Sequence, residues 1–146
     1  MARTYRLSPA RRAANTVMSA MIRLGAGGPS SYHLLTTTGR RSGQPRETPV
    51  ILLEMDAQRW LVSPYGAVGW VHNVRATPRV SLRRGRTTEV LDASEVDAET
   101  AGPVLQRYVR EASITAPFFD AKADDPTQRF VAEASRHPVF RLKGVR

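Results

Sequence analysis

The sequence predicts an α+β domain built around an antiparallel, barrel-like sheet. Its 146 residues suffice for one domain with an ordinary hydrophobic core. Five or six short segments rich in β-branched and aromatic residues alternate with turn signals, which is typical of antiparallel strands. Long crossover connections, which a doubly wound parallel sheet needs, are few. We therefore expect a single domain (1–146), in which an N-terminal helix and linker (1–28) precede the barrel (29–146).

A basic amphipathic helix is expected first. Ser8 and Pro9 combine an N-cap residue with proline at the first helical position. Apolar residues then recur at helical spacing until the glycine-rich stretch 25–29 ends the element. Arg11, Arg12 and Arg23 flank this apolar stripe. Such a helix can pack on the domain with its polar face in solvent. Alternatively, it can act as a membrane-surface or lid helix, and the sequence leaves both possibilities open.

The strands and the remaining helices follow from local turn and capping signals. Two strands, 32–38 and 48–53, flank an arginine-rich segment (39–46) and predict a hairpin. The other expected elements are a strand at 59–63, a helix at 69–76, a hairpin of strands at 79–84 and 86–93, a helix at 97–112, a short helix at 128–135 and a closing strand at 138–142.

Several function classes lose support from composition and missing motifs. The chain has no cysteine, which excludes disulfides, thiolate zinc sites and a cysteine nucleophile. His33, His72 and His137 stand far apart, so no metal site is expected. The serine-nucleophile elbow, the Walker pattern and the dinucleotide fingerprint are also absent. Neither a membrane-spanning stretch nor a signal-peptide pattern occurs, so we expect a cytoplasmic protein.

The positive charge is concentrated in the first part of the chain. The formal net charge is +9, and residues 1–86 contain 14 arginines against three acids, Glu47, Glu54 and Asp56. A partner that meets this part of the protein meets a positive field, which suits phosphate, polycarboxylate, nucleic acid or an anionic membrane surface. Arginine-rich composition alone also fits a GC-rich genome, so the positions of the arginines carry the argument.

The turn between the first two strands has the composition of an anion site. Arg40, Arg41 and Arg46 supply planar charged donors, and Ser42 adds a small hydroxyl. Glycines in the same turn allow backbone N–H groups to approach an anion. The sequence therefore predicts a phosphate or carboxylate site here, although an arginine-rich hairpin tip in water has the same composition.

A second cluster of candidate residues lies at 63–73. Gly66 and Gly69 allow a flat ligand to approach the main chain, and Trp70 offers an aromatic surface. Asn73 follows Trp70 by one helical turn and so shares its face. The alternative is structural: Trp70 is a core anchor and Asn73 a helix-end hydrogen bonder. Together with the basic turn, this cluster suits a ligand with an anionic tail and a ring.

Two motifs carry a family resemblance. The run LLTTTGRRSGQPRETP (34–49), followed by Gly69-Trp70-x-x-Asn73 and Ala76-x-Pro78-x-Val80, resembles the deazaflavin-dependent nitroreductases. These are split β-barrel oxidoreductases of actinobacteria, related in fold to FMN-binding pyridoxamine-phosphate oxidases. The resemblance covers residues 32–84 and implies a split β-barrel of about six mostly antiparallel strands with flanking helices. It also implies coenzyme F420 as cofactor rather than FMN. F420 is a deazaflavin whose phosphate and oligoglutamate tail matches the basic turn.

The resemblance also implies roles for individual residues. Arg40, Arg41, Ser42 and Arg46 would hold the phosphate and the tail carboxylates, Pro49 and Val50 would border the chromophore, and Ser63, Tyr65, Gly69, Trp70 and Asn73 would surround the ring system. The tyrosine-rich substrate segment of the family is not evident here, and Phe118 and Phe119 are the substitutes that we expect at the substrate. Tyr65 or water would supply the proton that the product needs.

The implied reaction is hydride transfer from reduced F420 to an electron-poor small molecule such as a quinone, an activated alkene or a nitroaromatic. One alternative is a non-catalytic barrel that binds a deazaflavin, flavin, haem or lipid. A nucleic-acid-binding barrel is disfavoured, because aromatic residues are few and scattered in the basic part of the chain. The resemblance further suggests a homodimer. The basic N-terminal helix suggests peripheral association with the inner face of the plasma membrane, where quinones reside.

Overall fold

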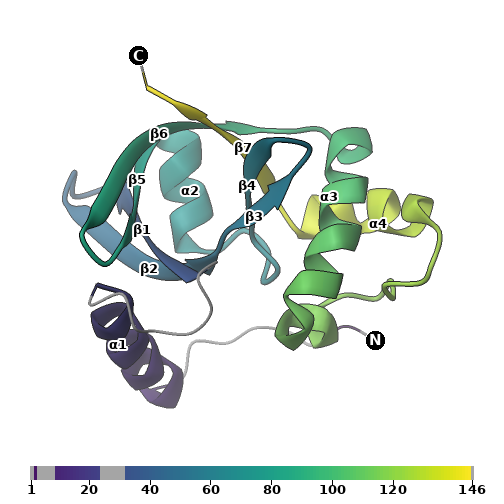
Figure 1. Cartoon of the computed structure of the whole chain (residues 1–146), viewed down its shortest axis with the longest axis horizontal. Helices are drawn as coiled ribbons and strands as arrows, with labels where there is room; N and C mark the ends of the chain where they lie inside the picture. The colour runs from purple at the N-terminus through teal and green to yellow at the C-terminus, as the bar shows by residue number, and fades with distance from the viewer. Residues whose placement is uncertain (1, 3–8, 24–31, 146) are drawn as a thin grey trace.

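The structure, a computed structural model, describes residue 2 and residues 9–23 and 32–145 (Figure 1). Its helices are α1 (Pro9–Arg23), α2 (Gly69–Ala76), α3 (Ala98–Glu111) and α4 (Thr127–Glu133), with two short 3-10 helices, η1 (Ser113–Phe118) and η2 (Ala134–Arg136). Its strands are β1 (Tyr32–Thr38), β2 (Pro45–Ile51), β3 (Leu53–Met55), β4 (Gln58–Val62), β5 (Arg79–Arg84), β6 (Thr87–Glu95) and β7 (Val139–Gly144).

All seven strands join one antiparallel sheet in the order β2-β1-β5-β6-β7-β4-β3. The sheet curls, as Figure 1 shows, so the expected barrel-like α+β fold is confirmed. The strand expected at 48–53 is divided, because the chain leaves the sheet at Leu52 and continues as β3 at the opposite edge. The first hairpin is also tighter than expected: β2 begins at Pro45, and Arg46 pairs with Thr37.

Two clusters of buried side chains form the core. The first fills the curl of the sheet, where Val71 and Val74 of α2 pack with Phe140 of β7. The second lies where α3 and α4 meet β4, and its Leu105 and Phe130 are fully buried. Burial of these side chains is the main favourable contribution to folding. It also fixes α2 and α3 on two sides of the strands that line the candidate site.

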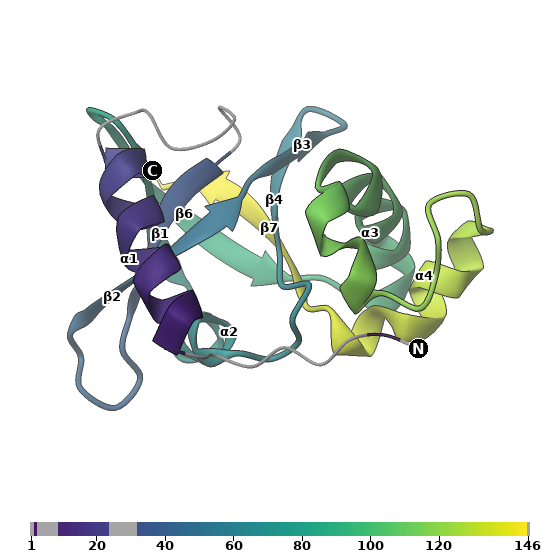
Figure 2. The same cartoon turned by 90° about the horizontal axis from the view of Figure 1, so that it is seen from below.

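The helices occupy separate ends of the molecule. Figure 2 shows α3 and α4 together at one end and α1 beside β1 and β2 at the other. In the structure α1 packs on the domain: Ile22 is fully buried and its carbonyl accepts a hydrogen bond from the Gly85 N–H at 2.9 Å. The expected cap at Ser8 and the terminating stretch 25–29 lie outside the described residues. The helix expected at 97–112 begins with an N-cap, since the Asp97 carboxylate accepts from the Thr100 N–H at 2.9 Å.

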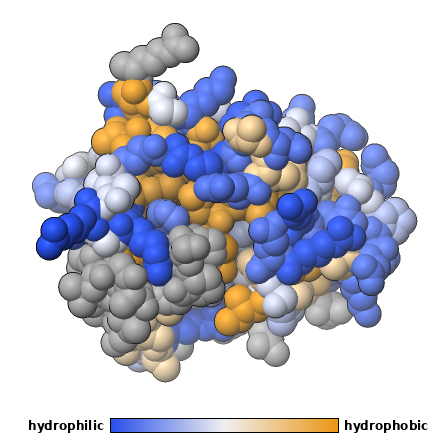
Figure 3. Space-filling model, viewed as in Figure 1, coloured by the Kyte–Doolittle hydropathy of each residue, from blue (hydrophilic) through white to orange (hydrophobic). Residues whose placement is uncertain are grey.

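The face of the molecule that is seen in Figures 1 and 3 carries both hydrophilic and hydrophobic residues. In Figure 3 hydrophilic residues cover much of the periphery, and hydrophobic residues show between them towards the middle. Among the described residues, no helix combines the length and the apolar character needed to cross a membrane.

Candidate active site

One large cavity, of about 1000 Å³, brings the two predicted clusters together. It runs between the β1–β2 loop, β2, the segment before α2, the first turn of α2, and α3 with η1; α1 adds part of the wall. Ten of the eleven residues expected at the cofactor line it: Arg40, Arg41, Ser42, Arg46, Pro49, Val50, Tyr65, Gly69, Trp70 and Asn73. Residues far apart in sequence thus meet at one site.

The basic turn is held in shape by its own backbone. The Gly39 N–H donates to the Gln44 carbonyl and the Gly43 N–H to the Gly39 carbonyl, both at 2.8 Å. Gly43 has φ +70°, and a Cβ at Gly39 would lie 2.7 Å from the Ser42 Oγ. Both positions therefore require glycine. The Ser42 hydroxyl accepts from the Gln44 N–H at 3.1 Å, so it shapes the loop and remains able to donate into the cavity.

The arginines of this turn differ from those elsewhere in the protein. Arg59, Arg75 and Arg79 each pair with a carboxylate across the sheet or from a neighbouring element. Within the described part of the chain, Arg40, Arg41 and Arg46 form no ion pair. Three exposed guanidinium groups at one end of a cavity, with no carboxylate of their own, make a site for an anionic group.

Asn73 joins this turn to α2. Its side chain is buried, and its Oδ1 accepts from the Arg40 N–H at 3.1 Å and from the Arg40 Nη1 at 3.0 Å. Its Nδ2 donates to the Thr37 Oγ1 at 3.1 Å. The Arg40 Nη1 also lies 3.4 Å from the Gly69 carbonyl oxygen. Asn73 therefore orients Arg40 through its amide oxygen, and one of the two hydrogens on its Nδ2 is left to face the cavity.

The segment between β4 and α2 forms a tight loop against the cavity. The Ser63 hydroxyl donates to the Gly66 carbonyl at 2.5 Å, and Gly66 has φ +92°. Ser63 is fully buried and does not line the cavity, unlike its expected position beside the ring. Its hydroxyl is used by the loop itself, so its effect on a ligand is exerted through the positions of Pro64 and Tyr65.

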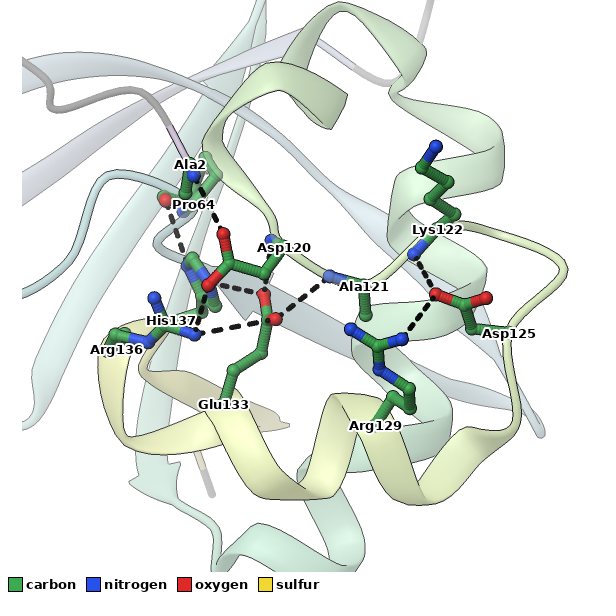
Figure 4. A network of polar contacts seen from close by, with 10 residues as sticks. All are labelled: Ala2, Pro64, Asp120, Ala121, Lys122, Asp125, Arg129, Glu133, Arg136 and His137. Carbon is green, nitrogen blue, oxygen red and sulfur yellow. Dashed lines mark hydrogen bonds and ion pairs between the residues drawn. The ribbon is translucent and has the colours of Figure 1, made fainter.

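A buried polar network holds this loop in place through the Pro64 carbonyl. His137 is buried between two acceptors: its Nδ1 donates to the Pro64 carbonyl at 2.9 Å, and its Nε2 lies 2.9 Å from the Glu133 Oε1 (Figure 4). Glu133 also accepts from the backbone N–H groups of Asp120 and Ala121. Burial lowers the pKa of His137, and the Pro64 and Glu133 contacts oppose this shift.

The same network extends to the protein surface. Arg136 pairs with the Asp120 carboxylate at 2.9 Å, and the Ala2 N–H donates to the other Asp120 oxygen at 2.7 Å. Both contacts lower the pKa of Asp120, with the Arg136 hydrogen bond contributing most. Figure 4 shows these groups converging from α4, the segment before it and the loop at Pro64. One wall of the cavity is thereby tied to the α3–α4 end of the molecule.

Aromatic and aliphatic side chains form the middle of the cavity. Trp70 is half-buried and its ring tilts against Phe140 at 5.8 Å between centroids. Tyr65 is 37% exposed and meets the edge of Phe118 at 4.7 Å. Pro49 contributes from β2. These surfaces suit a planar ring system.

Phe118 and Phe119 are placed differently from the substrate position expected for them. Both are buried in the core cluster of α3 and α4, and neither lines the cavity. Phe118 supports Tyr65, while Phe119 stacks on the His137 ring with 4.0 Å between centroids. Both rings are buried by packing in the core. They therefore hold Tyr65 and His137 in place and present no surface to a ligand.

The far end of the cavity was not expected from the sequence. Tyr108 from α3, together with Ile114 and Thr115 from η1, lines it. Tyr108 is only 2% exposed, and the helical spacing of its segment does not reveal that this buried residue lines a cavity. Among the described residues, no group of three or more histidine and carboxylate side chains is arranged to hold a metal ion.

Comparison with known families decides the assignment. Residues 9–133 match the family of F420H(2)-dependent quinone reductases. The chain belongs to this family. The quinone reductase family assignment makes the protein an F420-dependent reductase with coenzyme F420 as its cofactor. The resemblance carried by residues 34–49 and 69–73 is thereby confirmed at the level of the F420-dependent split barrels.

Solved structures show the same fold at low sequence identity. A domain-swapped dimer is 21% identical, with a TM-score of 0.56 over 93% of this chain and 100% of its own. Rv2991 from Mycobacterium tuberculosis, a conserved hypothetical protein, is also 21% identical, with a TM-score of 0.53 over 100% and 86%. A Listeria innocua protein assigned to the pyridoxamine 5′-phosphate oxidases is 14% identical, with a TM-score of 0.53 over 80% and 85%. These likenesses support the split-barrel fold of the quinone reductase family.

The residues that line the cavity fit both ends of F420, its anionic tail and its ring. The guanidinium groups of the basic turn, which have no carboxylate partner among the described residues, suit its phosphate and carboxylates, and the surfaces of Pro49, Tyr65 and Trp70 suit its ring. The cavity of about 1000 Å³ also lies at the upper end of the range for small-molecule sites, which allows a large cofactor and a second ligand.

Proposed function

We propose that this protein binds F420H2 with its tail on the basic turn and reduces a quinone, with nitroaromatics and activated alkenes as further acceptors. Bound F420H2 supplies a hydride to the acceptor. The observation that carries the proposal is the set of three arginines without carboxylate partners at one end of a cavity whose remaining walls are largely apolar and aromatic. The family assignment favours this enzyme over a non-catalytic ligand-binding barrel.

The basic turn binds the anionic part of the cofactor. Arg41 and Arg46 are exposed, and their guanidinium groups form no hydrogen bond with another described residue. Both are therefore available to phosphate and carboxylate groups. Arg40 is oriented by Asn73, which places one guanidinium group in a defined position. Ser42 donates its hydroxyl hydrogen from within the turn. These residues fix the register of the cofactor along the cavity.

The middle of the cavity orients the ring. Pro49, Val50, Gly69 and Trp70 border it, and Tyr65 covers it from the loop before α2. A Cβ at Gly69 would meet nothing within 4 Å, so a ring can approach the main chain there. Apolar walls exclude water from the reacting atoms, which protects a hydride from transfer to solvent.

Tyr65 is the protein group that we propose as proton donor to the reduced acceptor. It lines the cavity and remains 37% exposed, so its hydroxyl can exchange its proton with solvent. Tyr65→Phe is expected to lower kcat, since the substitution removes the hydroxyl and keeps the ring. An unchanged kcat together with an unchanged solvent isotope effect would assign the proton to water.

A binding titration tests the cofactor assignment. Trp70 lines the cavity, so its emission is expected to fall when F420 binds. F420 is titrated into the wild type, Arg46→Ala and Arg79→Ala, with FMN in parallel. Arg79 is the matched control, because it carries the same charge and pairs with Asp92 outside the cavity. Weaker F420 binding in Arg46→Ala alone supports the proposal. Equal losses in both variants, or tighter binding of FMN, would refute it.

Assembly and membrane association are further proposals. One solved relative is a domain-swapped dimer, and a homodimer of this chain is expected on the same fold. Light scattering at several protein concentrations tests this expectation. Peripheral membrane association through α1 is tested by sedimentation with anionic vesicles, in which deletion of residues 1–25 should abolish binding. Unchanged binding of the truncated protein would contradict it.

A further inference from the structure

We propose that His137 is a positioning residue for the cofactor site. Through the hydrogen bond from its Nδ1 to the Pro64 carbonyl, it holds the cavity wall formed by Pro64 and Tyr65 against the F420 ring. This inference rests on the proposed function, in which Tyr65 covers the ring. It gives the two ring nitrogens separate roles, since the contact of Nε2 with Glu133 orients the imidazole and contributes to stability.

The hydrogen bond from His137 reaches the peptide unit next to Tyr65. His137 itself does not line the cavity, whereas Pro64 and Tyr65 do. The Nδ1 atom lies 2.9 Å from the Pro64 carbonyl oxygen, in a buried contact. A carbonyl oxygen only accepts, so Nδ1 carries the hydrogen of this bond. Because the peptide unit between Pro64 and Tyr65 is planar, holding its oxygen restrains the point from which the Tyr65 side chain projects.

Residues 136–138 pack along the loop at 63–66. The Ser63 N–H donates to the Pro138 carbonyl at 2.8 Å. A Cβ at Gly66 would lie 3.5 Å from the Arg136 carbonyl oxygen, which is ordinary van der Waals contact. The two ends of the loop therefore lie against residues 136–138. Between these ends, the His137 side chain supplies the hydrogen bond to the loop.

The imidazole is held in one orientation before any ligand binds. Its Nε2 lies 2.9 Å from the Glu133 Oε1, and Phe119 stacks on its face with 4.0 Å between centroids. Glu133 is fixed in turn by two backbone N–H groups of the segment before α4, as Figure 4 shows. A buried ring that is held on its face and at its far nitrogen keeps Nδ1 directed at Pro64.

The position of this wall matters to a ring in the cavity. Tyr65 meets the edge of Phe118 at 4.7 Å between centroids, so its side chain is supported from behind while its backbone is held by the loop. A gap of about 0.5–1 Å between packed surfaces already forfeits roughly a quarter to a half of their dispersion energy. Loss of the Pro64 bond should therefore weaken the packing of Tyr65 on the cofactor ring.

Two substitutions of the same residue separate the two bonds. His137→Asn and His137→Gln both remove the imidazole and its stacking on Phe119. The amide nitrogen of asparagine takes the place of Nδ1, so it can still donate to Pro64. The amide nitrogen of glutamine takes the place of Nε2, so it can still donate to Glu133. A purely structural role of the ring predicts equal effects of the two variants, whereas the proposal predicts different ones.

The first readout needs no ligand. Hydrogen exchange of the backbone N–H groups within residues 63–68 should be about 2- to 10-fold faster in His137→Gln and as in the wild type in His137→Asn. Thr127→Val is the control for a general loss of stability. The Thr127 hydroxyl donates to the Gln106 Oε1 at 2.6 Å and lies outside the cavity. This variant should lower the Tm and leave exchange at 63–68 unchanged.

The second readout is the affinity for oxidised F420, followed by tryptophan emission. His137→Gln should bind F420 about 2- to 10-fold more weakly, and His137→Asn should bind it as the wild type does. The same pair is then compared in a Tyr65→Ala background, where the wall that His137 positions is missing. There the difference between the two variants should disappear, because residues that act through one contact are not additive.

Each other outcome overturns the inference or separates it from the proposed function. Equal changes in the two variants would mean a purely structural imidazole, and a larger effect of His137→Asn or wild-type behaviour of His137→Gln would equally overturn the proposal. A difference that persists with Tyr65→Ala would place the effect of His137 elsewhere and also overturns it. A wild type that binds no F420 refutes the proposed function instead, and the exchange rates then still test whether His137 positions the loop.

Discussion

Asn73→Ala should weaken binding of the cofactor tail without touching the ring. Asn73 is buried, and its amide makes three hydrogen bonds, two with Arg40 and one with Thr37. Alanine removes all three and leaves the Arg40 N–H without its acceptor. At about 0.5–1.5 kcal/mol for each bond, the free energy of unfolding should fall by roughly 2–4 kcal/mol. For a domain of this size the Tm should fall by roughly 6–12 °C.

Two ligands separate the role of Asn73 from that of a ring contact. F420 carries the anionic tail, whereas its tail-less deazaflavin precursor carries the ring and ribityl chain alone. Because Asn73 orients Arg40, the variant should bind F420 more weakly and the tail-less compound as the wild type does. His72→Ala is the control on the same helix, since His72 is exposed and does not line the cavity.

The two ligands distinguish three possible roles of Asn73. Equal loss of affinity for both ligands in Asn73→Ala would mean that Asn73 contacts the ring, as the family resemblance implied. Full retention of F420 affinity together with the expected loss of stability would mean that the orientation of Arg40 does not matter to the tail. Fluorescence titration at a temperature well below the Tm of the variant distinguishes these outcomes from unfolding.

Three further predictions follow from the contacts around the site. Gly39→Ala should lower both the Tm and the affinity for F420, because a Cβ there would lie 2.7 Å from the Ser42 Oγ and 3.0 Å from the Gln44 carbonyl oxygen. Gly69→Ala should leave the Tm unchanged, since a Cβ there meets nothing within 4 Å. Glu133→Gln should lower the free energy of unfolding by about 1–3 kcal/mol in urea titrations, because one amide cannot accept all the bonds that the carboxylate accepts. Burial holds the pKa of His137 below its ordinary value, so the unfolded chain takes up the proton first and stability should fall as the pH drops through about 6.5. Urea titrations across this pH range should show a smaller slope in His137→Gln, and an identical slope would contradict the assignment.

Local patterns predicted most of the elements that carry the site. The helix at 69–76 and the strand at 32–38 begin and end where turn chemistry placed them. The basic turn was recognisable for the same reason, because its glycines and arginines are adjacent in the chain. The division of 48–53 at Leu52 was not predictable, since it follows from the two strands joining opposite edges of the curled sheet.

Contacts between distant segments account for what the sequence did not reveal. Asn73 bonds Arg40 across 33 residues, and the spacing within its helix only placed it near Trp70. Tyr108 is buried on α3, and its access to the cavity depends on how α3 packs beside the loop at Pro64. Phe118 was expected at the substrate as a substitute for the tyrosine-rich segment of the family, and packing instead places it against Tyr65. Such assignments need the tertiary arrangement.

The central claim is that the basic turn holds the cofactor of a hydride-transfer enzyme. Its most direct test is the anaerobic oxidation of F420H2 by menadione, followed through the recovery of deazaflavin absorbance with wild type and Arg46→Ala at varied F420H2 concentration. Loss of a tail contact that is the same in the ground and transition states should raise KM for F420H2 and leave kcat unchanged. Absence of turnover in the wild type, or a fall in kcat with an unchanged KM in Arg46→Ala, would contradict the account.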